Sequence, residues 1–122
     1  MPTEPETPTL AQVVHRAVEV CDPAGENEGV AQLLARFEDR DEPVTSFGEV
    51  EQELMEGKGA IDPEDEDPAV TMATAVALYL AHRRTQIESD RDELLRLAAR
   101  DEFDGQPPDP VARWLADQGV EL

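Results

Sequence analysis

The sequence predicts an all-α protein, folded as a compact irregular bundle of five or six short helices. Apolar residues recur at helical spacing in successive segments. No segment between turn signals shows period-2 alternation of β-branched or aromatic residues, so we expect no strand. The run 69–81, AVTMATAVALYLA, carries no charged residue. A helix that is apolar nearly all round belongs inside a bundle, so a helix at about 68–85 is expected at the centre.

The N-terminal part predicts a leader followed by two helices. Residues 1–8 contain prolines and glutamates and almost nothing apolar, which predicts a disordered acidic leader before a single helical domain at 9–122. The first helix should begin near Thr9, and after the turn DPAGENEG, which includes Gly29, a second helix should follow. The apolar stripes of these helices are formed by Leu10, Val13, Val14, Ala17, Val18 and Cys21, and then by Val30, Leu33, Leu34 and Phe37.

A short acidic helix should come third. Ser46 and Glu49 have the spacing of a capping box at its start. Gly57 and Gly59 are expected to stop it, because glycine is common just past the end of a helix.

The central helix has signals at both ends. Asp67 is a suitable N-cap and Pro68 a suitable first helical residue. His82, Arg83 and Arg84 would complement the negative end of the helix dipole. The apolar run is too short to cross a membrane, which takes about 20 predominantly apolar residues.

Two more helices are expected near the C-terminus. Ser89 precedes the fifth, and Asp109 as N-cap with Pro110 as the first helical residue opens the sixth. Gly119 should end the sixth helix, and docking of this helix on a second copy would give a homodimer. The inward-facing residues of the two helices should be Leu94, Leu95, Leu97, Ala98 and Phe103, and then Val111, Trp114 and Leu115.

The charge limits the partners. The chain has 29 acidic against ten basic residues and a formal net charge of -19. Nucleic acids and anionic membranes are bound through Lys and Arg, so we expect neither to bind directly.

Lys58 is the only lysine, and acid excess with little lysine is expected in a salt-adapted cytoplasm. A GC-rich genome would also favour arginine over lysine.

Cys21 is the only cysteine, so neither an intrachain disulfide nor a cysteine zinc cluster is expected. The N-terminus lacks the basic and apolar segments of a secretory signal, which agrees with a cytoplasmic location. Paired with His15 or His82, Cys21 could act as a nucleophile, but its place on an apolar stripe favours a buried thiol. We expect no catalytic residues and no cofactor.

The acidic run at 62–67 has three interpretations. An EF-hand loop beginning at Asp62 would need glycine at its sixth position and an acid at its twelfth, where Asp67 and Ala73 stand. A different calcium or magnesium site made by Asp62, Glu64 and Asp65 is the weaker metal hypothesis. A decoy for a nucleic-acid-binding protein is the second interpretation, and a solvated approach to the central helix is the favoured one.

These observations predict a small acidic cytoplasmic protein that acts as a non-enzymatic protein-interaction or regulatory module. The alternative is a nucleic-acid mimic that blocks the basic site of a DNA- or RNA-binding protein. An enzyme or divalent-metal-dependent protein with no recognisable motif is third. Trp114 fits core packing better than an interface anchor. The candidate partner-binding residues are Glu64, Asp65, Glu66 and Trp114.

Overall fold

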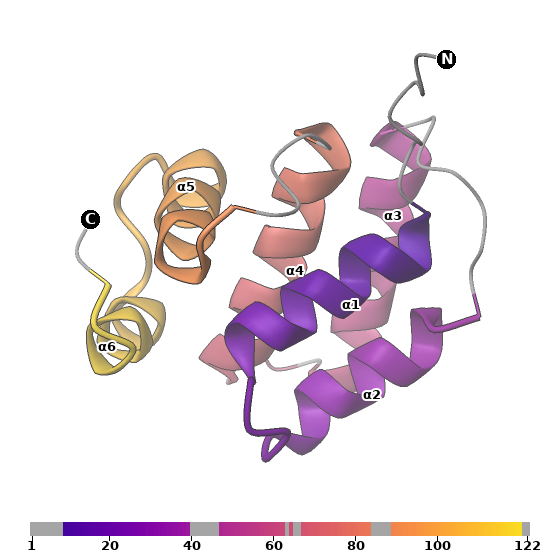
Figure 1. The fold of residues 1–122 in the computed structure, drawn as a ribbon, viewed down its shortest axis with the longest axis horizontal. Coiled ribbons are helices and arrows are strands. Elements are labelled where there is room, and N and C mark those ends of the chain that lie inside the picture. Colours follow the sequence, from indigo (N-terminus) through magenta and orange to yellow (C-terminus); the bar gives the residue numbers. More distant parts are fainter. Residues whose placement is uncertain (1–8, 40–46, 63, 65–66, 84–88, 121–122) are drawn as a thin grey trace, which may run out of the picture.

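The computed structural model describes residues 9–39, 47–62, 64, 67–83 and 89–120. This part of the chain contains six α-helices and no β-strand, which confirms the predicted all-α bundle (Figure 1). The helices are α1 (Leu10–Cys21), α2 (Glu28–Phe37), α3 (Phe47–Ile61), α4 (Pro68–His82), α5 (Arg91–Phe103) and α6 (Asp109–Asp117).

Helix α4 is the centre of the bundle, as its composition predicts. Each of the other five helices packs against it, and in Figure 1 it lies between α3 on one side and α5 and α6 on the other. Eleven of its fifteen residues are buried, many of them alanine, so neighbouring helices approach closely. The helix ends at His82, with Arg83 as C-cap, earlier than the expected end at about 85. None of the described helices is long and apolar enough to cross a membrane.

Three of the described helices begin with side-chain caps, namely α1 at Thr9, α2 at Asn27 and α4 at Asp67. Thr9 Oγ1 accepts a hydrogen bond from the Gln12 amide (3.1 Å), and Gln12 Oε1 accepts one from the Thr9 amide (2.9 Å). This capping box fixes the start of α1 where the apolar stripe begins. At α4, Asp67 Oδ1 accepts from the Ala69 amide (3.0 Å), which confirms Asp67 as the predicted N-cap. The expected cap at Ser46 lies outside the described residues.

The sequence predicts that three glycines break or end helices, but all three lie inside helices, so those predictions are wrong. Gly29 belongs to the first turn of α2, while Gly57 and Gly59 belong to α3. A Cβ atom on Gly29 would lie 2.7 Å from Val70 Cγ2, so glycine here permits close packing of α2 on α4. A helical glycine costs about 1 kcal/mol relative to alanine, an amount that packing against α4 readily offsets.

The starts of the last two helices each differ from the prediction by one residue. Asp90, without a side-chain cap, precedes α5, and the Ser89 carbonyl instead accepts a hydrogen bond from Arg16 Nη2 (2.7 Å). In α6, Pro108 holds the N-cap position and Asp109 is already helical. These starts follow from tertiary contacts and proline geometry, which override the local preference of Ser and Asp for the cap.

Candidate functional site

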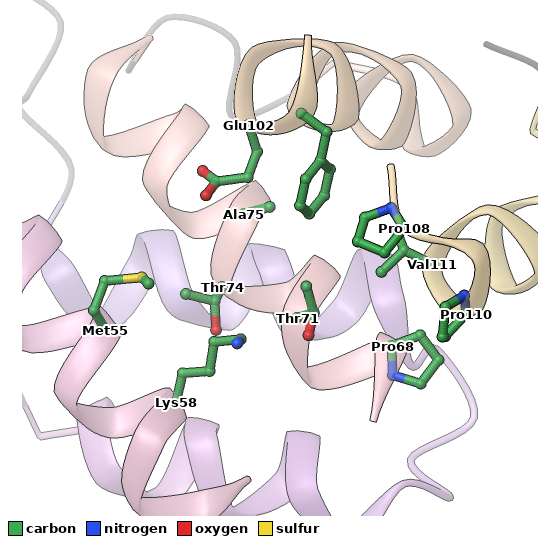
Figure 2. Close-up of a pocket in the computed structure, with 11 residues that line it drawn as sticks. Met55, Lys58, Pro68, Thr71, Thr74, Ala75, Glu102, Pro108, Pro110 and Val111 are labelled. Atoms are coloured by element: carbon green, nitrogen blue, oxygen red, sulfur yellow. The ribbon is translucent and has the colours of Figure 1, made fainter. Parts of the chain in front are cut away.

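A pocket of about 240 Å³ opens on the side of α4 that faces away from α1 and α2, and we call it the α4 pocket (Figure 2). Figure 2 shows residues of α3 on one side, residues of α4 at the back, and the start of α6 on the other side. The described lining residues are Met55, Lys58, Pro68, Thr71, Thr74, Ala75, Glu102, Phe103, Pro108, Pro110 and Val111.

The pocket lies where the helices that pack on α4 do not pack closely against one another. Helices α3, α5 and α6 each pack on α4, but α3 makes no comparable packing with α5 or α6. The face of α4 between them therefore contributes Thr71, Thr74 and Ala75 to the lining. Pro108 and Pro110 add rigid apolar rings where the chain enters α6.

Met55 brings apolar surface to the outside of the pocket. Its side chain is 46% exposed, and it is the one large hydrophobic residue exposed in the described chain. Its neighbour Leu54 is fully buried, since consecutive helical residues point in different directions. The polar Thr74, in contrast, is satisfied internally, because its hydroxyl donates to the Val70 carbonyl (2.9 Å).

Charged groups lie at the mouth of the pocket. Partial burial raises the pKa of the Glu102 carboxyl, nearby Asp101 and Glu51 raise it further, and Lys58 opposes them. Glu51, Met55 and Lys58 follow one stripe of α3 at i, i+4 and i+7 spacing. Glu102 and Lys58 thus line the pocket itself, and the carboxylates of Glu51 and Asp101 act on Glu102 from nearby.

A second, more open hollow of about 410 Å³ lies where α1 ends and α2 and α4 begin. Trp114 lines it and also packs against the core, so its side chain is half-buried. The described lining residues are Cys21, Asp22, Pro23, Ala24, Glu26, Asn27, Ala69, Trp114 and Gln118.

Polar side chains in this second hollow hold helix ends together. Asn27 Oδ1 accepts from the Val30 amide (2.9 Å) and caps α2, while its Nδ2 donates to Asp67 Oδ2 (3.2 Å). Asp22 Oδ2 in turn accepts from the Asn27 amide (2.9 Å). These carboxylate and amide oxygens are thus used to join α1, α2 and α4.

The residues of the acidic run serve the chain locally where they are described. Asp62 Oδ2 accepts from the Asp67 amide (2.9 Å), which closes the connection between α3 and α4. Glu64 is exposed on that connection, and Asp65 and Glu66 lie outside the described residues. Within the described part, no three His, Cys, Asp or Glu side chains are grouped closely enough to hold a metal ion.

Cys21 is buried as a free thiol. Burial raises the pKa of this thiol well above its ordinary value; the nearby Arg91 guanidinium lowers it and the Asp22 carboxylate raises it. Arg91 is itself engaged, since its Nε donates to the Val20 carbonyl (2.6 Å) and its Nη2 to Gln118 Oε1. The thiol is protonated and enclosed, as its place on the apolar stripe predicts.

The sequence interpretation missed the α4 pocket altogether. Met55, Pro108 and the other prolines lie outside the apolar stripes of the sequence, and the polar lining residues come from three different helices. The run QPPDP and the exposed Met55 next to buried Leu54 are the signals that could have indicated it. Comparison with known protein families, with curated proteins and with solved structures gave no match to this chain.

Proposed function

We propose that the protein is a non-enzymatic interaction module that binds a basic protein partner. The observation that carries this proposal is the exposure of the acidic side chains. No described Asp or Glu is buried, and most are exposed. Such a surface attracts a basic surface over several ångströms and speeds the encounter with it.

Two of the described cations, in contrast, are held by hydrogen bonds within the fold. Arg16 pairs with Glu19 (2.5 Å) and donates to the Ser89 carbonyl, while Arg91 links α1, α5 and α6 through its hydrogen bonds. Lys58 is half-buried beside the α4 pocket. The exposed acidic side chains still far outnumber the four exposed arginines of the described chain, so the field that a partner meets is negative.

A binding role also fits the chemistry of the two hollows. The α4 pocket is lined mainly by apolar and proline side chains, which bury surface and do not move protons. The one thiol is enclosed and protonated, so it is a poor nucleophile. A free buried thiol is also suited to a reducing compartment, and we place the module in the cytoplasm.

The test is capture from a lysate of the source organism, with zero-length carbodiimide cross-linking of carboxylates to partner lysines and identification of the joined residues by mass spectrometry. We expect one basic protein, released as salt rises and cross-linked at a consistent set of carboxylates. As a control, the triple variant Glu26→Gln/Glu28→Gln/Glu38→Gln removes three negative charges at sites away from the α4 pocket. Capture of no specific protein would overturn the proposal.

The alternative function, a nucleic-acid mimic, is favoured by the same exposed carboxylates. DNA presents about one negative charge per 1.7 Å of its axis, and a net charge of -19 on 122 residues can offer comparable rows to a basic cleft. A mimic's partner would bind nucleic acid. Labelled duplex DNA or single-stranded RNA should then be displaced from the captured partner by this protein, and an undisturbed complex would exclude mimicry.

A further inference from the structure

We infer that the α4 pocket docks a basic amphipathic helix of the partner, with one apolar side chain entering the pocket and Lys or Arg side chains facing the carboxylates at its mouth. This inference rests on the proposed function and specifies its binding site. The juxtaposition of an apolar hollow, an exposed methionine and a carboxylate border carries it.

The volume suits a single large apolar side chain. A cavity of about 150 Å³ lined by apolar residues holds a benzene molecule. The α4 pocket, at about 240 Å³, has room for the side chain of a Leu, Met or Phe. Its walls include the buried Ala75 and Val111 and the partly exposed Phe103, so such an anchor would contact apolar side chains on several sides.

Met55 makes the opening adaptable. A methionine side chain is unbranched and polarizable, and it fits ligands of different shapes. At 46% exposure it leaves apolar surface in water that a bound helix would cover. Pro108 and Pro110 on the opposite side are rigid, so one wall of the pocket can adjust while the other keeps its shape.

The charges select a basic occupant over a second copy of this chain. Glu51 and Asp101 both act on Glu102 at the mouth, and a ligand cation placed among these groups would relieve their mutual repulsion. Lys58 offsets part of this charge, so the ligand's cations should approach on the Glu51 and Asp101 sides. A second copy would bring another net charge of -19 to the same surface.

A helix is the form of peptide that fits this site. Extended peptides commonly bind by adding a strand to the edge of a sheet, and the described chain has no strand. Hydrophobic hollows between helices typically receive the apolar face of an amphipathic helix, whose anchors recur at i, i+3, i+4 and i+7.

The experiment measures fluorescence anisotropy of a dye-labelled peptide with the full chain. The peptide has about 16 residues, with Leu and Phe at i, i+3, i+4 and i+7 and Lys or Arg elsewhere. A scrambled peptide of the same composition keeps the charge and loses the apolar face. We expect the patterned peptide to bind about tenfold more tightly than the scrambled one, a ratio typical of losing one good anchor.

The discriminating variants are Met55→Glu and Gln32→Glu, which add the same negative charge at exposed sites on α3 and α2. Attraction by charge alone predicts that both bind the basic peptide equally well or more tightly than wild type. Docking in the α4 pocket predicts that Met55→Glu binds about tenfold more weakly and that Gln32→Glu does not lose affinity. Unchanged melting temperatures for both variants would show that the fold is intact.

The inference is overturned if both variants bind alike or if the scrambled peptide binds as well as the patterned one. In either case, a basic partner that cross-links to carboxylates elsewhere on the surface would leave the proposed function standing. Absence of any specific partner from the lysate, in contrast, would remove the proposed function itself.

Discussion

Asn27 is the side chain that most directly joins separate elements of the fold. Its Oδ1 caps α2 at the Val30 amide, and its Nδ2 donates to Asp67, which caps α4. One amide thus serves two helix starts that are 40 residues apart in the sequence. The sequence indicated Asp67 as a cap, because Asp followed by Pro is a local signal. The link from Asn27 depends on tertiary placement, which no local pattern contains.

We predict that Asn27→Ala lowers the free energy of unfolding by about 1–2 kcal/mol, since loss of an N-cap side chain alone costs about 0.5–2 kcal/mol. Asn27→Asp should keep the cap and still destabilise, because it replaces the donor to Asp67 with a like charge. Urea unfolding followed by circular dichroism measures both. Gln32→Ala, an exposed change within α2, is the control and should stay within about 0.5 kcal/mol. Equal stability of Asn27→Ala and wild type would contradict the role of this amide.

Glu102 has a pKa raised by partial burial and by neighbouring acids, so folding favours its neutral form. The stability that this group contributes is complete below its ordinary pKa and is lost as pH rises through the raised value. Glu102→Gln should therefore raise the melting temperature near pH 7, and the gain should shrink below about pH 4. Glu56→Gln, which removes one exposed charge from α3, should give a smaller gain. A gain independent of pH would contradict the pKa shift.

At the scale of elements, α3 shows where sequence patterns mislead. Its glycines read as a stop signal, yet the helix continues through both of them to Ile61. The two positions also differ in a way that the sequence does not contain. A Cβ on Gly57 would lie 3.2 Å from Phe37 Cε2 and from Arg36 Cδ, whereas Gly59 has nothing within 4 Å. Only the packing of α2 against α3 distinguishes them.

We predict that Gly59→Ala stabilises the protein by about 0.5–1 kcal/mol, the ordinary difference between glycine and alanine inside a helix. Gly57→Ala should gain less or lose stability, because its new methyl group must displace the ring of buried Phe37. Urea unfolding of the two variants under identical conditions measures the difference. A gain for Gly57→Ala equal to that for Gly59→Ala would contradict the close contact between α2 and α3.

At the scale of the whole molecule, the all-α class and the central position of α4 follow from the sequence alone. A charge-free stretch of thirteen residues at 69–81 has no solvent-facing side, and this decides its place before any contact is known. The α4 pocket does not follow in this way. It depends on how far apart α3 and α5 lie on α4, and crossing geometry is set by the sum of many packing contacts.

The net charge of -19 has its own consequence for stability. Exposed carboxylates repel one another, and at about 1 M salt the screening length falls to about 3 Å. We predict that molar potassium chloride raises the melting temperature, as a salt-adapted protein requires. The Glu26→Gln/Glu28→Gln/Glu38→Gln variant should respond less to the salt. A melting temperature that does not change with salt would contradict salt adaptation.

The measurement that tests the central claim most directly is amide chemical-shift mapping of the ¹⁵N-labelled full chain during titration with the basic amphipathic peptide. Docking in the α4 pocket predicts that the largest shifts occur around this pocket and that α1 and α2 change little. The residues expected to respond most are Met55, Thr71, Thr74, Ala75, Phe103 and Val111. Shifts spread over the exposed acids of α2, or centred on the hollow beside Trp114, would contradict the claim.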